Sequence, residues 1–410
     1  MPYMKRQDHA KRVLVIGPGM EIGGVEKSLL GFLRVLTEAE YEPDLFLFSH
    51  TGSLLPMIDS AVRILPEEPR LARIYYPVRK LVQQGHFYTA FIRTVCKAYG
   101  SLRRKATNTA DISMKLSQRI ILRHVRKNKE KYDYAFGFFE PHYYLADKVD
   151  AKVKIGWVHT DYCAEKRDPA FDLPVWQKLD YIACVSSKVR EAFIRKYPSE
   201  AHKTIVVPNA VSPDLIRAQS MEQEELPEMK ESGAFRIVTV GRFSYAKGMD
   251  RVPAVCRKLT DRGYRIKWYL IGYGPDRDKI AEEIRKESVG EQVQILGPKE
   301  NPYPYMGLCD LYVQPSRFEG KSVAVTEAQI LHKPVMITRY PTSADQLDEG
   351  EDGFICEQGT DGIAEGIQYL IDHPDVRDTF IQYTYRKDYN QTEAIRALFQ
   401  LEPKETESRQ

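Results

Sequence analysis

Several sequence features that would assign a chemistry at once are missing from this chain of 410 residues. Its six cysteines have no CxxC spacing and several lie in apolar, strand-like runs, so reduced core thiols explain them better than disulfides or zinc. No Walker P-loop and no GxSxG occur, which leaves ATP hydrolysis and acyl transfer without support. Asp276 and Asp278 follow a Gly-Pro turn, where acids favour a helix start, so no metal site is predicted.

Long apolar runs are missing as well. No stretch of about 18 apolar residues occurs, and residues 1–11 are polar and lack the apolar segment of a signal peptide. We therefore expect a cytoplasmic protein. Hydrophobic residues make up 43% of the chain and charged residues 29%, as in soluble globular proteins. The length predicts two domains of roughly 200 residues each.

Acidic residues are scarce in residues 70–131, which hold sixteen Lys and Arg but only Asp111 and Glu130. The net charge of +3 conceals this basic segment, whose helical pattern mixes cations with aromatic side chains. Such a mixture predicts contact with an anionic membrane, and hence a peripheral position on the inner face of the plasma membrane. A solvated helical face remains the alternative. Nucleic acid is disfavoured, because the rest of the chain is mildly acidic and contains no recognition module.

Strand and helix patterns alternate on both sides of a polar segment rich in Glu, Gln, Pro and Ser. Buried-strand patterns occur at 11–17, 44–49, 132–139, 153–159, 181–186 and 204–207, and then at 235–240, 266–271, 293–296 and 311–314. The expected fold is α/β, with two Rossmann-like domains facing one another across a cleft. The expected boundaries are an N-terminal domain at 1–211, a linker at 212–233, a second domain at 234–375 and a C-terminal segment at 376–410.

The stretch 315–331, PSRFEGKSVAVTEAQIL, combines two acids with the start of a predicted helix. Ser322 can cap this helix, and the free N–H groups of its first turn would face an anion above Gly320. Glu319 and Glu327 would then stand on either side of an anion site. A capped surface helix that carries a solvated Glu is the alternative interpretation.

Two cations are expected near this anion site. Arg242 and Lys247 follow the first strand of the second domain, and the loops at the carboxyl ends of parallel strands share one rim. Two fixed cations with backbone donors suit a diphosphate, and Glu327 suits ribose hydroxyls. Together these residues predict a nucleotide-diphosphate sugar as ligand. By the same rule, His159 and Asp161 at the end of a strand are placed for chemistry, although a strand-end His can equally be a hydrogen-bonding strut.

The chain resembles the retaining GT-B glycosyltransferases of family GT4. The resemblance rests on six motifs in the family's order, which are GGVEK at 23–27, HTD at 159–161, GRFSYAKG at 241–248, GYGP at 272–275, NPYPY at 301–305 and FEGKSVAVTEA at 318–328. It implies a GT-B fold, and transfer of a sugar from a nucleotide-diphosphate donor, with UDP the expected nucleotide. It also implies that the C-terminal helix returns to the first domain.

The resemblance assigns roles to individual residues. It implies that Arg242 and Lys247 neutralise the donor diphosphate, that Glu319 binds hydroxyls of the donor sugar, that Glu327 binds the ribose, and that His159 lies beside the reacting sugar. Asp161 is a candidate on the acceptor side, without a general-base role. The further donor-binding positions are Gly23, Gly24, Gly241, Gly272, Gly320, Lys321, Ser322 and Val323.

The implied mechanism is a front-face reaction in which the departing phosphate helps to remove the acceptor's proton, with no cofactor and no metal ion. We expect the acceptor to be a glycan, a lipid-linked saccharide or a cell-envelope polymer. The basic segment 70–131 is a departure from the family pattern and lies where the family recognises acceptors. Two alternatives are a UDP-sugar 2-epimerase of the same fold and a non-catalytic protein that binds a nucleotide or glycan.

Overall fold

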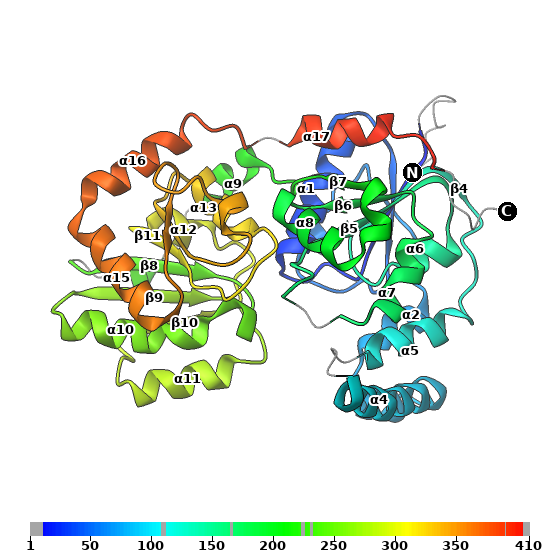
Figure 1. Cartoon of the computed structure of the whole chain (residues 1–410), viewed down its shortest axis with the longest axis horizontal. Coiled ribbons are helices and arrows are strands. Elements are labelled where there is room, and N and C mark those ends of the chain that lie inside the picture. Colours follow the sequence, from blue (N-terminus) through cyan, green and yellow to red (C-terminus); the bar gives the residue numbers. More distant parts are fainter. Residues whose placement is uncertain are drawn as a thin grey trace. The chain divides into compact units, whose positions relative to one another are not determined.

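The computed structural model describes residues 11–107, 112–164, 167–222, 226–229, 233–389 and 391–404. They form two compact units, each with one parallel sheet and helices packed against it (Figure 1). Unit 1 takes the described residues up to Glu21, those within Val25–Ala210 and those from Gln391 onward. Unit 2 takes Ile22–Gly24 and the described residues from Val211 to 389. The predicted α/β fold with two Rossmann-like domains is confirmed.

The sheet of unit 1 has the strand order β3-β2-β1-β4-β5-β6-β7, and all its pairings are parallel. Its strands are β1 (Val13–Gly17), β2 (Pro43–Leu47), β3 (Arg63–Ile64), β4 (Lys131–Gly137), β5 (Asp150–Val158), β6 (Tyr181–Cys184) and β7 (Thr204–Val206). Most central residues are buried on both faces, which explains the nearly continuous apolar runs in the sequence. The pattern predicted every strand of this sheet except the short, exposed β3, and in unit 2 it did not predict the strands at 335–338 and 354–356.

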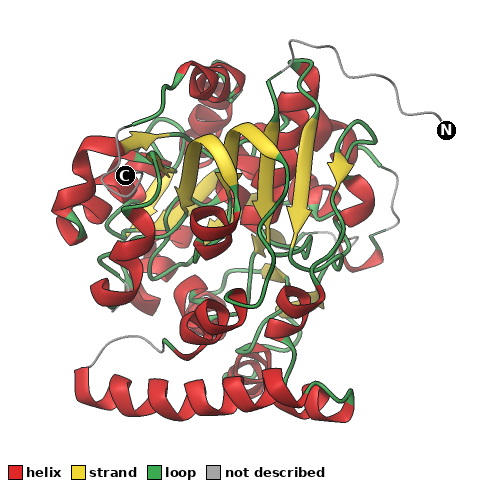
Figure 2. Ribbon diagram, turned by 90° about the vertical axis from the view of Figure 1, so that its right-hand side faces the viewer, coloured by secondary structure: helices red, strands yellow, loops and turns green. Residues whose placement is uncertain are grey.

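The helices of this unit are α1 (Gly24–Glu38), α2 (Pro69–Ala72), α3 (Val78–Gln83), α4 (Phe87–Thr107), α5 (Ser113–Leu122), α6 (Tyr143–Lys148), α7 (Pro169–Trp176), α8 (Ser187–Lys196) and α17 (Thr392–Ala397). The basic segment 70–131 is mainly helical as far as Leu122, as predicted, but residues 123–130 form turns and loop and Lys131 begins β4. Residues 108–111 lie outside the described residues. It forms a small core of its own, where Ile74, Ile92, Cys96 and Ile121 pack together. The long helix α4 is seen side-on in Figure 2.

The sheet of unit 2 has the strand order β10-β9-β8-β11-β12-β13, again all parallel. Its strands are β8 (Phe235–Val240), β9 (Ile266–Ile271), β10 (Val293–Gly297), β11 (Leu311–Gln314), β12 (Val335–Thr338) and β13 (Phe354–Cys356). Its helices are α9 (Pro213–Ser220), α10 (Val252–Asp261), α11 (Arg277–Lys286), α12 (Tyr303–Leu308), α13 (Val323–Ile330), α14 (Ser343–Gln346), α15 (Gly359–Asp372) and α16 (Pro374–Thr384). Strands β8 and β11 lie side by side, so the loops that follow them leave the same edge of the sheet.

Two segments differ from the sequence expectation. The predicted linker 212–233 contains helix α9, whose buried Ile216 packs with Leu226 and Met229 in a core of unit 2. This helix buries one apolar residue in eight positions, which is too few to give a helical period of apolar residues in the sequence. The C-terminal segment contains α16, in unit 2, and α17, whose Ile395 joins the core of unit 1, instead of one helix. Residues 223–225, 230–232, 390 and 405–410 of these segments lie outside the described residues.

Two further features of the structure are the state of the cysteines and the length and hydropathy of the helices. All six cysteines are free thiols; Cys163 is exposed and the others are buried. None of the helices that the structure describes combines the length and hydropathy needed to cross a bilayer.

Candidate functional site

The loop after β8 holds the predicted cations Arg242 and Lys247. Its packing against neighbouring loops depends on two glycines, Gly272 and Gly248. Gly272 has φ +144°, and a Cβ atom on it would lie 1.9 Å from the carbonyl oxygen of Gly241. Any larger residue would therefore collide with the backbone of the neighbouring loop. Arg242 follows Gly241 and is exposed, and no ion pair joins its guanidinium to a carboxylate of the described chain. The loop thus presents Arg242 to solvent while its base is fixed by close backbone packing.

A second close approach brings Lys247 to the loop after β11. Gly248 ends the short 3-10 turn Tyr245–Lys247 with φ +67°, and a Cβ atom on it would lie 2.0 Å from the carbonyl oxygen of Pro315. The two loops can therefore touch only because this position is glycine. As a result, Lys247 Nζ donates to Glu319 Oε1 at 2.6 Å, although the residues are 72 positions apart. The sequence prediction that these loops converge is confirmed at this contact.

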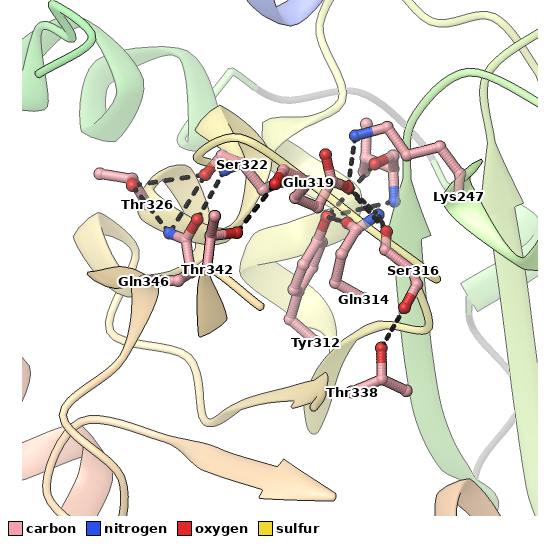
Figure 3. A network of polar contacts seen from close by, with 11 residues as sticks. Lys247, Tyr312, Gln314, Ser316, Glu319, Ser322, Thr326, Thr338, Thr342 and Gln346 are labelled. Carbon is pink, nitrogen blue, oxygen red and sulfur yellow. Dashed lines mark hydrogen bonds and ion pairs between the residues drawn. The ribbon is translucent and has the colours of Figure 1, made fainter. Parts of the chain in front are cut away.

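Glu319 lies in a network of buried polar side chains at the end of β11 (Figure 3). Its Oε1 also accepts a hydrogen bond from Ser316 Oγ at 2.6 Å and a longer one from Gln314 Nε2 at 3.5 Å. Tyr312 donates in turn to Gln314 Oε1 at 2.8 Å, and Gln314 Nε2 donates to Ser316 Oγ at 3.0 Å. The Glu319 carboxylate accepts these hydrogen bonds at Oε1, and no group of the described chain donates to Oε2. One carboxylate oxygen is thus held in place and the other is left for a further donor.

A bidentate ion pair ties the same two loops together a second time. Arg317 Nη1 and Nη2 lie 2.7 and 3.0 Å from the two carboxylate oxygens of Asp250, and Lys279 Nζ lies 2.8 Å from Asp250 Oδ2. Burial opposes ionisation of Asp250, but the bonds from Arg317 and Lys279 outweigh it and lower its pKa to about 2. The bidentate pair between Arg317 and Asp250 fixes the backbone around Lys247 and Glu319 and requires no ligand to do so.

Helix α13 begins where the sequence predicts, but its cap differs from the prediction. Ser322 occupies the N-cap position without a side-chain capping bond, which corrects the expected role of its hydroxyl. Instead, the backbone N–H of Ser322 donates to Gln346 Oε1 at 2.6 Å, and Gln346 Nε2 returns a bond to the Ser322 carbonyl at 3.3 Å. The first turn is therefore fixed by a side chain from α14, and Thr342 Oγ1 holds the Glu319 carbonyl at 2.8 Å. Of the adjacent positions, Gly320 and Val323 are buried.

The second acid of the stretch, Glu327, lies inside unit 2. It is 2% exposed, and its Oε1 accepts a hydrogen bond from the Tyr303 hydroxyl at 2.7 Å. Burial, followed by the charge of Glu327, raises the pKa of Tyr303 well above its usual value, so Tyr303 remains a donor. Lys321 precedes the helix, and its pKa is lowered, first by burial and then by the charge of Lys387. Tyr303 comes from the NPYPY motif, so the fold joins two of the sequence motifs here.

In unit 1, His159 follows strand β5 as predicted. Its Nε2 is enclosed and has no hydrogen-bond partner within the described residues. Burial lowers the pKa of His159 to about 4, although the nearby Glu140 acts in the opposite direction. Asp161 is buried, and its Oδ1 accepts the N–H groups of Cys163 at 2.8 Å and Ala164 at 3.4 Å. This bonding gives Asp161 a role in the turn of its own loop.

Gly23 lies directly before α1, and Gly24 is the first residue of that helix. They therefore occupy the glycine loop that the sequence predicts between the first strand and the first helix.

A buried ionic cluster near His159 was not predicted. Arg167 is 8% exposed, pairs with Glu140 and lies 3.7 Å from Asp172 Oδ2. Its guanidinium also lies 3.7 Å from the centre of the Tyr162 ring. Lys115 of the basic segment reaches the other oxygen of Asp172 at 2.5 Å. Glu140 follows β4 as His159 follows β5, so the strand-end rule that selects His159 could also have selected Glu140.

The two acids at 276 and 278 lie where a helix starts. Asp276 is the N-cap residue of α11, and Asp278 lies in its first turn. No group of three or more His, Cys, Asp or Glu side chains that could hold a metal ion occurs in the part of the chain that the structure describes.

Comparison with known proteins relates unit 2 to one family. Residues 221–387 match the family model of the glycosyl transferases group 1, and this range includes the candidate site residues from Gly241 to Glu327. The capsular polysaccharide biosynthesis glycosyltransferase CapM of Staphylococcus aureus is 25% identical over 204 residues, which are 48% of this chain and 54% of CapM. An N-acetylgalactosamine-N,N'-diacetylbacillosaminyl-diphospho-undecaprenol 4-alpha-N-acetylgalactosaminyltransferase of Campylobacter jejuni is 24% identical over 209 residues, 50% of this chain and 54% of the enzyme. The chain thus spans about half the length of the curated relatives it matches.

Solved structures extend the likeness to almost the whole chain. The crystal structure of Anabaena HepE in complex with UDP-glucose matches with a TM-score of 0.68 and 14% sequence identity, and the match covers 95% of this chain and 98% of HepE. At this identity the likeness concerns the fold alone, which is the GT-B fold with two Rossmann-like domains. The match of residues 221–387 to the glycosyl transferases group 1 supports the resemblance noted in the sequence, while family GT4 and the retaining mechanism stay predictions.

Proposed function

We propose that this chain, whose residues 221–387 belong to the group 1 glycosyltransferases, moves a sugar from a nucleotide-diphosphate sugar to an acceptor hydroxyl. The observation that carries the proposal is the contact between Lys247 and Glu319 at the end of β11. It holds a cation and a carboxylate together in a polar network, while Arg242 stays exposed after the neighbouring strand.

In this proposal Lys247 and Arg242 bind the donor diphosphate. An ammonium group has three donors, and Glu319 takes one of them, so Lys247 can bind Glu319 and a phosphate oxygen together. Glu319 Oε2 accepts a hydroxyl of the donor sugar, because Oε1 is already occupied by Lys247 and Ser316. Glu327 takes the ribose, with Tyr303 fixing its orientation. Backbone N–H groups around the start of α13 add donors for the phosphate or sugar.

The proposed reaction retains the configuration of the sugar and needs no metal ion. The bond between the anomeric carbon and the phosphate oxygen breaks, the acceptor oxygen forms a bond to that carbon on the same face, and the departing phosphate takes the acceptor's proton. Lys247 and Arg242 stabilise the charge that develops on the leaving diphosphate. His159, whose low pKa keeps its ring neutral at pH 7, donates or accepts a hydrogen bond at the sugar without adding charge.

UDP-sugars are the proposed donors, and a glycan, lipid-linked saccharide or cell-envelope polymer is the proposed acceptor. The names of CapM and of the Campylobacter enzyme support this acceptor class, and the UDP-glucose complex of HepE supports the nucleotide.

A thermal-shift screen against UDP, GDP, ADP and their sugars tests the donor site. A ligand at 100 times its Kd stabilises the protein by about 2.7 kcal/mol, so the preferred nucleotide should stand out clearly. We expect UDP-sugars to give the largest shift, EDTA to leave it unchanged, and Lys247→Met to reduce it. If no nucleotide shifts the wild type, the donor assignment is wrong. Conversion of the donor alone to an epimer would indicate a 2-epimerase, and binding without any transfer across an acceptor panel would indicate a non-catalytic protein.

A further inference from the structure

Helix α4, the long helix in Figure 2, carries an exposed apolar stripe that the proposed reaction does not use. Its side chains recur every three or four positions and therefore share one side of the helix. They are Phe87, Phe91, Val95, Tyr99 and Leu102, with exposures of 65%, 67%, 49%, 45% and 69%. A different side of the helix packs into the small core of the basic segment, where Ile92 and Cys96 are buried. The stripe is thus a second apolar face, open to solvent.

The charge beside the stripe has one sign. Helix α4 contains five Lys and Arg and no Asp or Glu. Lys97, Arg104 and Lys105 are exposed, and no ion pair joins them to a carboxylate of the described residues. In helix α3, Arg79 and Lys80 are exposed in the same way, beside Val82, which is 46% exposed.

The stripe is held rigidly on unit 1. Arg93 Nη1 donates to the carbonyl oxygens of Ile74 and Tyr76, both at 2.5 Å. Arg103 Nε donates to Asp168 Oδ2 at 2.8 Å, and Asp168 caps the start of α7. The surface therefore exists before any partner arrives and needs no folding step to form.

We propose that the exposed face of α4 docks unit 1 on an anionic lipid bilayer. Aromatic and aliphatic side chains enter the boundary between headgroups and acyl chains, while the flanking cations bind lipid phosphates. A second copy of the chain fits this face less well, because two acid-free helices would bring charges of the same sign together. Nucleic acid fits it less well because Val95 and Leu102 on a convex helix offer neither a groove nor a stacking surface. The proposal depends on neither the donor nor the reaction.

Co-sedimentation with vesicles tests it on the full chain without any substrate. We expect binding to vesicles of phosphatidylcholine with phosphatidylglycerol, weaker binding to phosphatidylcholine alone, and release by salt. The triple change Phe87→Ser, Phe91→Ser and Leu102→Ser should lower the partition coefficient by about tenfold or more, because three inserted side chains are lost. The change Lys97→Glu, Arg104→Glu and Lys105→Glu should abolish the preference for the anionic lipid.

Matched controls lie in unit 2. Met221→Ser removes a side chain that is 79% exposed, and Arg285→Glu with Lys286→Glu reverses charge on the exposed helix α11; both should bind vesicles as the wild type does. Lys247→Met should also bind normally, which separates this proposal from that of the donor site. Absence of wild-type binding, or equal binding by the α4 variants, would overturn the proposal. A dimer in sedimentation velocity that the triple Ser variant abolishes, or tight binding of DNA or RNA in place of vesicles, would do so as well.

Discussion

Each unit contains a carboxylate that follows a strand and is paired with a cation, and the two pairs have different roles. In unit 2, Lys247 is 23% exposed and contacts one oxygen of Glu319, with the other oxygen left unoccupied within the described residues. In unit 1, Arg167 is 8% exposed and is enclosed by Glu140, Asp172 and the Tyr162 ring. The first pair keeps hydrogen-bonding capacity for a ligand. In the second pair, the charged groups neutralise one another and contribute to the stability of the fold.

The difference shows how one type of contact can serve binding in one domain and stability in the other. A buried pair that loses a member leaves an uncompensated charge, whereas a partly exposed pair loses little when water can replace the partner. The exposure of the cation and the unused acceptor, more than the identity of the charged residues, therefore distinguish the candidate donor site from the structural cluster.

Arg167→Met should produce the largest effect, on stability. Removing the guanidinium leaves the buried Asp172 and the partly buried Glu140 without this partner, which should lower the free energy of unfolding by about 3 to 5 kcal/mol in urea titrations. Adding Glu140→Gln should recover part of the loss, because the second unpaired charge is removed. A loss below about 1 kcal/mol would mean that the cluster is solvated, and the contrast between the two pairs would fail.

Lys247→Met and Glu319→Gln should have the opposite profile, with a large effect on turnover and a small one on stability. We expect turnover to fall by more than about tenfold, since charged contacts to the leaving group and sugar contribute a few kcal/mol to catalysis. The free energy of unfolding should fall by less than in Arg167→Met, because Lys247 is 23% exposed and water can replace it beside Glu319, which is 9% exposed.

Lys279→Met provides a matched control for this prediction. It removes another lysine to carboxylate contact in unit 2, the one to Asp250, and Lys279 is 54% exposed. This variant should retain turnover close to that of the wild type. Wild-type turnover in both Lys247→Met and Glu319→Gln would refute the assignment of the donor site.

The sequence predicted that two loops of unit 2 meet but did not predict the ionic cluster of unit 1, for a physical reason. The positions of the loops that carry Lys247 and Glu319 could be predicted from strand patterns and short motifs, because glycine positions and apolar runs are local sequence signals. The partner of a single buried charge is not local: Lys115 meets Asp172 across 57 positions and Arg167 meets Glu140 across 27. The N-cap of α13 was misjudged for the same reason, since Gln346 replaces the Ser322 side chain from 24 positions away.

The smallest expected effect is on the pH dependence of stability and concerns His159. Unlike the charged pairs of the two units, this candidate site residue should stay uncharged near neutral pH. Its pKa is lowered to about 4 by burial, so its ring resonances should not titrate between pH 5.5 and 8 in NMR spectra, where His159→Asn identifies them by their loss. An unfolded His titrates near pH 6.5, so below that value the unfolded state binds a proton that the folded state does not. Stability should therefore fall as pH drops from about 6.5 toward 4, and it should fall less in His159→Asn than in the wild type. A ring that titrates near pH 6.5 would show that water reaches His159, and the strand-end site of unit 1 would then resemble the solvent-accessible site of unit 2.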